Sequence, residues 1–335
     1  MIIIRTPVRL SFGGGGTDLP SYYNKHDGMV VSTTINRYFY TLFNPRKDDK
    51  VQIYSSDLNI HEFFDSPEEF YEQSTLTVPR KILNHYSIEG GFDLILSSDV
   101  PPFAGLGGSS SLTVSLVKLC SELTGNKLFG EALAEEAHKM RTNVLQLPAG
   151  RQDEYAAAFG GFNVFKFHKD KVFRKKMVLP KSYLDKLNEY MLLFHTGIRR
   201  NSTNILETMN DDAESSEKSI CVDALHKVKS LGYQIVQAIE DRDFLSLGGW
   251  LNESWKEKKK FSKGVSNEFI DKMYDTAIRH GAYGGKVTGA GGGGFMMFLA
   301  PGHKHDKIIK NLSKHGMALY DFKFEDKGTE VIHND

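Results

Sequence analysis

The sequence predicts an α+β fold with two domains. Its 335 residues suffice for two domains of ordinary size, each with its own core. The first half consists mainly of segments typical of strands, interrupted by two helices, and the second half is mainly helical. Because strands and helices do not alternate regularly, the pattern favours α+β over a doubly wound parallel sheet.

In the first half, residue type and spacing mark the elements. The stretch Asn-Pro-Arg-Lys-Asp-Asp-Lys at 44–50 indicates a turn between two strands. A helix is expected at 109–123, because leucines recur on one stripe from Leu112 to Leu123, and a second helix is expected at 131–145. Segments rich in β-branched and aromatic residues are predicted to be strands: 2–4, 30–43, 51–54, 92–96 and 162–167.

Near residue 180 the composition shifts toward Glu, Lys and Leu. The charged segment 168–179 is the expected boundary, which gives an N-terminal domain at 1–172 and a C-terminal domain at 173–335. The elements predicted after it are a strand at 190–195, a helical region at 202–260, a helix at 267–280, two strands around a glycine loop at 282–300, a helix at 306–315 and a strand at 318–324.

Composition narrows the class of protein. The chain has 42 Lys+Arg and 42 Asp+Glu, which argues against a nucleic-acid binder, and its apolar runs are far shorter than a membrane span. Its two cysteines, Cys120 and Cys221, predict no disulfide framework, and the first residues lack the features of a signal peptide. We therefore expect a cytoplasmic protein with small-molecule ligands and no nucleic-acid or membrane partner; monomer and dimer both remain open.

The middle of three glycine clusters is the most informative: Pro101-Pro-Phe-Ala-Gly-Leu-Gly-Gly-Ser-Ser-Ser111. It follows a predicted strand and opens a predicted helix, so glycine amides and the helix start can bind a phosphate. The serines can supply N-capping oxygens and hydroxyl ligands for the phosphate or its metal ion. The alternative is a tight turn with a serine N-cap. No GxxxxGK[ST] motif or protein-kinase signature is present.

Each of the other two glycine clusters, taken alone, is weaker evidence for a ligand-binding site. In the first, Pro7-Val-Arg-Leu-Ser-Phe-Gly-Gly-Gly-Gly-Thr-Asp18, Arg9 suits phosphate oxygens and Asp18 suits sugar hydroxyls, although a glycine-rich hairpin would also explain it. The third, Lys286-Val-Thr-Gly-Ala-Gly-Gly-Gly-Gly-Phe295, contains GxGxxG, but a predicted strand follows it instead of a helix. We expect a loop between two strands that approaches a ligand or another loop.

Together and in this order, the three clusters resemble the GHMP family of small-molecule kinases. The resemblance covers nearly the whole chain. It implies an N-terminal ATP-binding domain with ribosomal-protein-S5-like topology, a ferredoxin-like C-terminal GHMP kinase domain, and ATP and Mg²⁺ as cofactors.

Within the family, the chain is similar to the sugar kinases that act on D-glycero-D-manno-heptose 7-phosphate. The similar stretches are 150–162, 195–202 and 284–295. That branch phosphorylates the anomeric C1 hydroxyl and gives a 1,7-bisphosphate for GDP-heptose and surface polysaccharide synthesis. Fucose-type kinases share much of the pattern, so a free-sugar kinase stays open, as does a catalytically silent sugar- or nucleotide-binding paralogue.

The resemblance also implies roles for individual residues. Asp153 would be the catalytic base and Arg9 a cation for the transition state, although a helix N-terminal carboxylate and a structural salt bridge are the plain alternatives. Ser109 would bind the metal ion. The ATP phosphates would lie on Gly105, Leu106, Gly107, Gly108, Ser109 and Ser110, and the substrate on Gly15, Gly16, Thr17, Asp18, Arg199, Arg200, Lys286, Gly291 and Gly292.

Arg199 and Arg200 are the candidates for holding the sugar's own phosphate, because arginine binds phosphate bidentately. The alternative is a surface charge pair. The run Lys256-Glu-Lys-Lys-Lys260 is expected to be a solvated helix end, though a lysine there could reach phosphate.

One position departs from the family pattern. Many members carry a metal-binding glutamate in the helix before the aspartate loop, and Arg141 takes that place here. Either Mg²⁺ is held by Ser109, phosphates and water, or Arg141 offsets phosphate charge directly, or activity is impaired.

Overall fold

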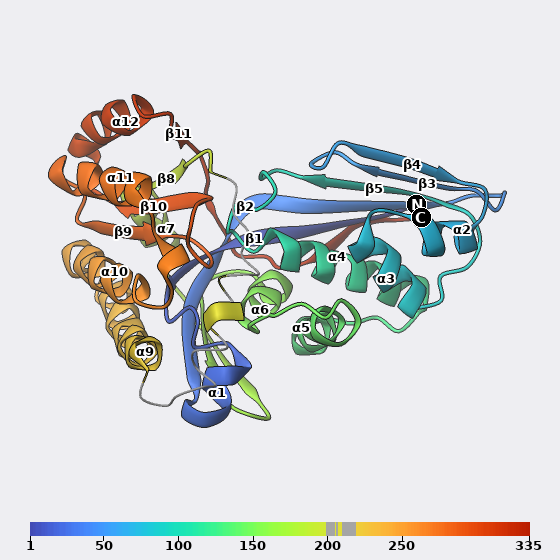
Figure 1. Ribbon diagram of the computed structural model, residues 1–335, viewed down its shortest axis with the longest axis horizontal. Helices are drawn as coiled ribbons and strands as arrows, with labels where there is room; N and C mark the ends of the chain where they lie inside the picture. Colours follow the sequence, from blue (N-terminus) through green and yellow to red (C-terminus); the bar gives the residue numbers. More distant parts are fainter. Residues whose placement is uncertain (199–204, 206, 210–218) are drawn as a thin grey trace.

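The structure is a computed structural model that describes residues 1–198, 205, 207–209 and 219–335. Its described strands form a nine-stranded sheet and a four-stranded sheet, and helices pack on both (Figure 1). Mixed strands and helices without regular alternation confirm the predicted α+β class. Arg199 and Arg200 lie outside the described residues.

The larger sheet is organised around two long strands. Its main order is β13-β1-β2-β5-β3-β4, with β12 and β6 paired elsewhere on β2, and β7 paired on β6. Because β2 has 18 residues, residues 39–45 can pair with β5 while residues 28–32 pair with β6. The strands of this sheet are β1 (Ile2–Gly13), β2 (Gly28–Pro45), β3 (Val51–Ser55), β4 (Ile60–Phe64), β5 (Phe92–Ser98), β6 (Asn163–Phe167), β7 (Val172–Lys176), β12 (Phe324–Glu325) and β13 (Glu330–Asn334).

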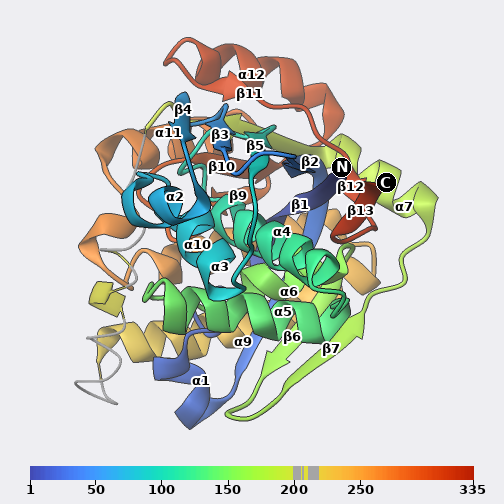
Figure 2. The same cartoon turned by 90° about the vertical axis from the view of Figure 1, so that its right-hand side faces the viewer.

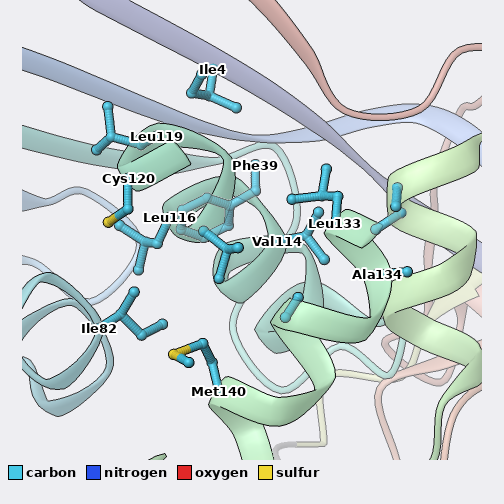
Figure 3. Close-up of a cluster of buried hydrophobic side chains, with 14 of the residues drawn as sticks. Ile4, Phe39, Ile82, Val114, Leu116, Leu119, Cys120, Leu133, Ala134 and Met140 are labelled. Atoms are coloured by element: carbon cyan, nitrogen blue, oxygen red, sulfur yellow. The ribbon is translucent and has the colours of Figure 1, made fainter. Parts of the chain in front are cut away.

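Helices cover one face of this sheet and form the first core. The central helix α4 contacts β1 and β2, and α5 and α6 lie beside it (Figure 2). Leu116 and Leu119 of the predicted leucine stripe are fully buried, packed among side chains from α3, α5, β1 and β2 (Figure 3). The helices are α1 (Pro20–His26), α2 (Pro67–Gln73), α3 (Thr77–His85), α4 (Gly108–Leu123), α5 (Gly130–Lys139) with a π-helical turn at Met140–Val144, and α6 (Gln152–Phe159).

In the smaller sheet, the inner strand β10 is buried on both faces. Met296 and Phe298 of this strand pack in one cluster with α11 and α12, whereas the alternate residues Phe295, Met297 and Leu299 pack with β1, α9 and α10. The second cluster therefore joins the two sheets. The order is β11 (Ala318–Leu319), β8 (Met191–His195), β10 (Phe295–Leu299) and β9 (Gly284–Val287); the helices are α7 (Lys181–Tyr190), α9 (Ile220–Glu240), α10 (Phe244–Lys258), α11 (Glu268–Arg279) and α12 (His305–Ser313).

The chain returns to its starting sheet at the end. Strand β13 pairs with β1, and the terminal amine of Met1 donates to the carbonyl of Asp335 at 3.2 Å, so the termini lie side by side (Figures 1 and 2). Strands β7, β12 and β13 all belong to the larger sheet. The division at 172/173 therefore remains a proposal about sequence segments, since the larger sheet contains strands from both sides of it.

Several predicted bounds differ from the structure. Strand β1 continues without interruption from Ile2 to Gly13, well beyond the segment expected at 2–4, and along it Val8, Leu10 and Phe12 alternate with the buried polar residues Arg9 and Ser11. The helix expected at 131–145 ends in the π-helical turn, and the strand expected at 318–324 holds only two residues, 318 and 319, before a separate short strand at 324. The described part of the helical region 202–260 contains a break at 241–243, between α9 and α10.

Candidate active site

A cleft of about 350 Å³ lies where the glycine clusters meet, a size typical of small-molecule sites. Strand β1 and the first glycine cluster form one side, the start of α4 and the start of α6 form another, and α10 with β9 closes the third. The cleft brings together these predicted site residues: Arg9, Gly15, Gly16, Asp18, Gly105, Gly107, Gly108, Ser109, Ser110, Asp153 and Lys286.

The middle glycine cluster turns sharply into α4. Gly107 is the N-cap residue and has a φ of 78°, a left-handed conformation that glycine adopts without strain. The predicted serine N-cap is therefore wrong, because the capping position needs a residue without a Cβ atom. Ser111 Oγ instead donates to the carbonyl of Pro7 at 2.9 Å. The first amides of α4, without partners inside the helix, remain suited to phosphate oxygens.

Arg9 and Asp153 form a bidentate pair beside this turn. Arg9 Nε and Nη2 donate to the two carboxylate oxygens of Asp153 at 2.7 and 2.8 Å. Arg9 Nη1 donates to the carbonyl of Gly105 at 2.8 Å, and the arginine is 4% exposed. A Cβ atom on Gly107 would lie 3.2 Å from Arg9 Cγ. The pair is thus fixed directly under the glycine turn.

Asp18, at the end of the first glycine cluster, also lines the cleft. Its carboxylate accepts hydrogen bonds from the amide of Gly16 at 3.0 Å and from Gln152 Nε2 at 2.9 Å. Burial, and secondly the charge of Asp153, raise the pKa of Asp18. Gly150 allows this approach, because a Cβ atom there would stand 1.9 Å from Asp18 Oδ2. Gln152 is a site residue that the sequence did not reveal.

Four predicted site residues do not line the cleft in the described part of the chain. Thr17 is fully buried; its hydroxyl lies within hydrogen-bond distance of the carbonyls of Gly14 and Met29 and accepts a hydrogen bond from the amide of Met29. Leu106 contributes its backbone, since its carbonyl accepts from the amide of Arg9 at 2.9 Å. Gly291 and Gly292 belong to the third cluster, whose cleft-lining residues are instead Gly289 and Ala290.

Two buried lysines reach the cleft, Lys286 from β9 of the smaller sheet and Lys258 from α10. Lys286 on β9 is 3% exposed, and among the described residues its Nζ has one hydrogen-bond partner, the carbonyl of Phe12 at 3.4 Å. Burial and the charge of Arg9 lower the pKa of Lys286 to about 7. Lys258 on α10 also lines the cleft, and its ammonium donates to the carbonyls of Val287 and Gly289. No sequence pattern separates Lys258 from the exposed lysines Lys256, Lys259 and Lys260 beside it.

Glu154 is a further residue that the sequence did not single out. It follows Asp153 in the first turn of α6 and is fully buried. Its Oε1 accepts a hydrogen bond from Ser110 Oγ at 2.8 Å and lies 3.0 Å from Arg141 Nε. Burial raises the pKa of Glu154 to about 7, while the charge of Arg141 acts in the opposite direction.

An arginine–aspartate pair anchored on a strand beside a glycine turn at a helix start suits phosphoryl transfer to a small molecule. The chain matches the family model for the GHMP kinases N terminal domain over residues 75–161 and that for the GHMP kinases C terminal over residues 235–317. It belongs to the GHMP kinase family and is an ATP-dependent sugar kinase.

The similarity to characterised relatives extends over most of the chain. The D-glycero-alpha-D-manno-heptose 7-phosphate kinase of Campylobacter jejuni is 34% identical over 332 residues, 97% of each chain. The L-fucokinase/L-fucose-1-P guanylyltransferase of Bacteroides fragilis is 23% identical over 88% of this chain and 34% of its own length.

Solved structures agree with the fold. A putative sugar kinase from Campylobacter jejuni has a TM-score of 0.79 at 32% identity and covers 98% of this chain and 97% of its own. A D-glycero-D-manno-heptose 1-phosphate kinase from Bacteroides thetaiotaomicron has a TM-score of 0.81 at 24% identity, with both chains fully covered. The expected two-part GHMP architecture is confirmed. None of the described helices has both the length and the apolar character that crossing a membrane requires.

Proposed function

We propose that this kinase transfers the γ-phosphate of ATP to the anomeric C1 hydroxyl of D-glycero-D-manno-heptose 7-phosphate. The product would be the 1,7-bisphosphate, a precursor for GDP-heptose and surface polysaccharide. The observation that carries the proposal is the Arg9–Asp153 pair, which lines the same cleft as the start of α4 and Asp18. The Campylobacter relative supports the choice of heptose.

In the proposed reaction, Asp153 accepts the proton of the C1 hydroxyl. Two hydrogen bonds from Arg9 fix its carboxylate, and a carboxylate retains lone pairs for a further donor. The sugar oxygen forms a bond to the γ-phosphorus as the bond to the β-phosphate oxygen breaks, and ADP leaves. The Arg9 guanidinium offsets negative charge next to the transferred group.

The remaining groups of the cleft suit the two substrates. Gly105, Gly107, Gly108 and Ser110 would line the ATP phosphates, with the carbonyl of Leu106 holding β1 in place. Gly15, Gly16 and Asp18 would bind sugar hydroxyls, with Thr17 shaping the turn behind them and Gly291 and Gly292 supporting the loop opposite. Asp18 suits this role because its buried carboxylate already accepts from the first glycine cluster and Gln152.

Lys286 is the described candidate for the sugar's own phosphate. Its buried ammonium lines the cleft and makes a single long hydrogen bond among the described residues, so an anion would satisfy it. Arg199 and Arg200 remain proposed partners for the same phosphate.

Mg²⁺ is proposed as the metal cofactor, with the Ser109 hydroxyl as its protein ligand. Among the described residues, no group of three or more His, Cys, Asp or Glu side chains gathers as a metal site. An ion that keeps waters and takes phosphate oxygens fits this donor set. When bound, it would neutralise charge on the ATP phosphates.

The test is ADP release with ATP and Mg²⁺ over a panel of heptose 7-phosphate, mannose 6-phosphate, fucose, galactose and mevalonate. Preference for heptose 7-phosphate is expected. Preference for a free sugar would keep the kinase and overturn both the substrate and the phosphate role of Lys286. ATP binding without turnover on the panel would instead favour a silent binding paralogue.

A further inference from the structure

Arg141 places a permanent positive charge at the first turn of α4. It lies in the π-helical turn after α5, its side chain lines the cleft, and the side chain is 12% exposed. Its Nη1 donates to Ser109 Oγ at 3.1 Å. A guanidinium carries five N–H donors and always keeps its charge, so this contact leaves donors for a ligand.

Glu154 anchors that guanidinium from behind. Glu154 is fully buried and also accepts from Ser110, so it ties Arg141 to the same turn of α4. Adjacent carboxylates of α6 therefore hold two different arginines: Asp153 holds Arg9, and Glu154 holds Arg141.

The Arg141–Glu154 pair makes fewer well-formed hydrogen bonds than the Arg9–Asp153 pair. The atoms Arg141 Nε and Glu154 Oε1 are 3.0 Å apart, yet Arg141 Nε makes no hydrogen bond of good geometry among the described residues. Glu154 Oε2 is likewise buried without a hydrogen-bond partner there. The guanidinium can turn toward an anion in the cleft without breaking a well-formed hydrogen bond to Glu154.

We propose that Arg141 binds phosphate oxygens of the nucleotide and that Glu154 is its positioning residue. The ligand class is a nucleoside di- or triphosphate, and the inference rests on the proposed function only in placing the nucleotide at α4. Because the guanidinium supplies a positive charge beside Ser109, nucleotide binding depends less on Mg²⁺ than it would without Arg141. Arg141 and Mg²⁺ then share the neutralisation of the phosphates.

The test compares ADP binding by calorimetry with excess Mg²⁺ and with a chelator. Arg141→Met is expected to weaken ADP binding about tenfold or more in the chelator and less in Mg²⁺. Arg141→Glu is expected to make ADP binding depend more steeply on Mg²⁺. Lys139→Met removes an exposed charge two residues away and is the matched control, with unchanged affinity.

Measuring adenosine binding distinguishes the loss of a phosphate contact from a general loss of structure in the variant. Its affinity is expected to be unchanged in Arg141→Met, because it lacks phosphates. Glu154→Gln keeps the guanidinium and loosens its tether, so ADP affinity should fall by about threefold to tenfold with adenosine again unaffected.

Two results would overturn the inference: ADP affinity in the chelator equal to that of the unaltered protein in both Arg141→Met and Glu154→Gln, or equal losses for ADP and adenosine. Failure of the proposed function is distinguishable, since it would appear in the unaltered protein as absent ADP binding or absent turnover on sugars.

Discussion

Asp153 is held by two hydrogen bonds from a single buried arginine, and that geometry fixes where its carboxylate can act. Because Arg9 also binds the carbonyl of Gly105, the pair and the middle glycine cluster form one rigid unit. As the proposed base, Asp153 would need no rearrangement before it accepts a proton.

Replacing Asp153 by Asn should abolish the base while keeping the side-chain shape. We expect kcat to fall by about 10²–10⁴-fold, with the dissociation constant for ADP changed by less than about threefold. Steady-state kinetics and calorimetry measure the two effects. Asp185→Asn, which alters an exposed helix carboxylate, is the control. Turnover close to that of the unaltered protein would show that Asp153 is not the base.

Lys286 should take up a proton when a phosphorylated sugar binds. Its pKa is lowered to about 7 by burial and by the charge of Arg9, so it is mostly neutral at about pH 8. A bound phosphate raises that pKa again, so uptake should approach one proton at about pH 8 and become small below about pH 6. Calorimetry of heptose 7-phosphate in buffers of different ionisation enthalpy measures this uptake.

Lys286→Met is the matched variant and should show no such uptake. Equal proton uptake in this variant and in the unaltered protein would remove Lys286 from the phosphate site.

The sequence predicted the residues that stand in distinctive glycine-rich surroundings, such as Arg9 and Asp18. It could not predict Glu154, because a carboxylate in the first turn of a helix is ordinarily explained by the helix dipole. Lys258 could not be predicted as a cleft residue for a different reason. It lies in a run of lysines whose other members are exposed, and only the packing of α10 on β9 shows that this one points inward.

At the scale of elements, the third glycine cluster supports the middle one. Gly294 has a φ of 77°, and a Cβ atom there would stand 2.2 Å from the carbonyl of Ala104. The amide of Phe295 donates to that carbonyl at 3.1 Å, which ties β10 to the loop before α4. The approach requires a residue without a side chain.

Gly294→Ala should therefore displace the loop before α4. We expect the free energy of unfolding to fall by more than about 1 kcal/mol and ADP affinity to fall with it. Gly249→Ala is the control, because that glycine lies inside α10 with open space around it and alanine favours a helix by about 0.5–1 kcal/mol. Urea unfolding measures the stability and calorimetry measures the affinity for ADP. Equal stability of the two variants would contradict the close contact between Gly294 and the carbonyl of Ala104.

Elements with one clear periodicity were predictable, and elements buried on two sides were less so. The stripe of α4 identified that helix within one residue of its start. In β1, Val8, Leu10 and Phe12 alternate with Arg9 and Ser11, a pattern typical of a strand, and the strand runs through them into the first glycine cluster. Pairing of β13 with β1 joins residues more than 300 positions apart, and no local pattern carries that information.

At the scale of the molecule, β1 connects the two sheets and the site. Val8, Leu10 and Phe12 pack in the cluster that reaches β10, while Arg9 between them faces the cleft. The other edge of β1 is closed by β13, and Arg5 donates to Glu330 at 2.7 Å there. The end of the chain thus stabilises the strand that carries Arg9.

Deleting residues 329–335 should destabilise the protein without removing any cleft residue. Loss of the β13 pairing is expected to lower the free energy of unfolding by about 2–4 kcal/mol, from several hydrogen bonds of about 1 kcal/mol each. Urea unfolding measures the change. Ile332→Ser, at a half-exposed position of the same strand, should cost much less. A truncated protein as stable as the full chain would contradict this role of β13.

The central claim is phosphoryl transfer to the anomeric oxygen of a sugar that already carries a phosphate. The most direct measurement is ³¹P NMR of the product formed from ATP and D-glycero-D-manno-heptose 7-phosphate. We predict two phosphate resonances from the sugar, with the new one coupled to the anomeric proton. ADP formation without a new sugar phosphate resonance, or a new resonance coupled to any other proton, would contradict the account.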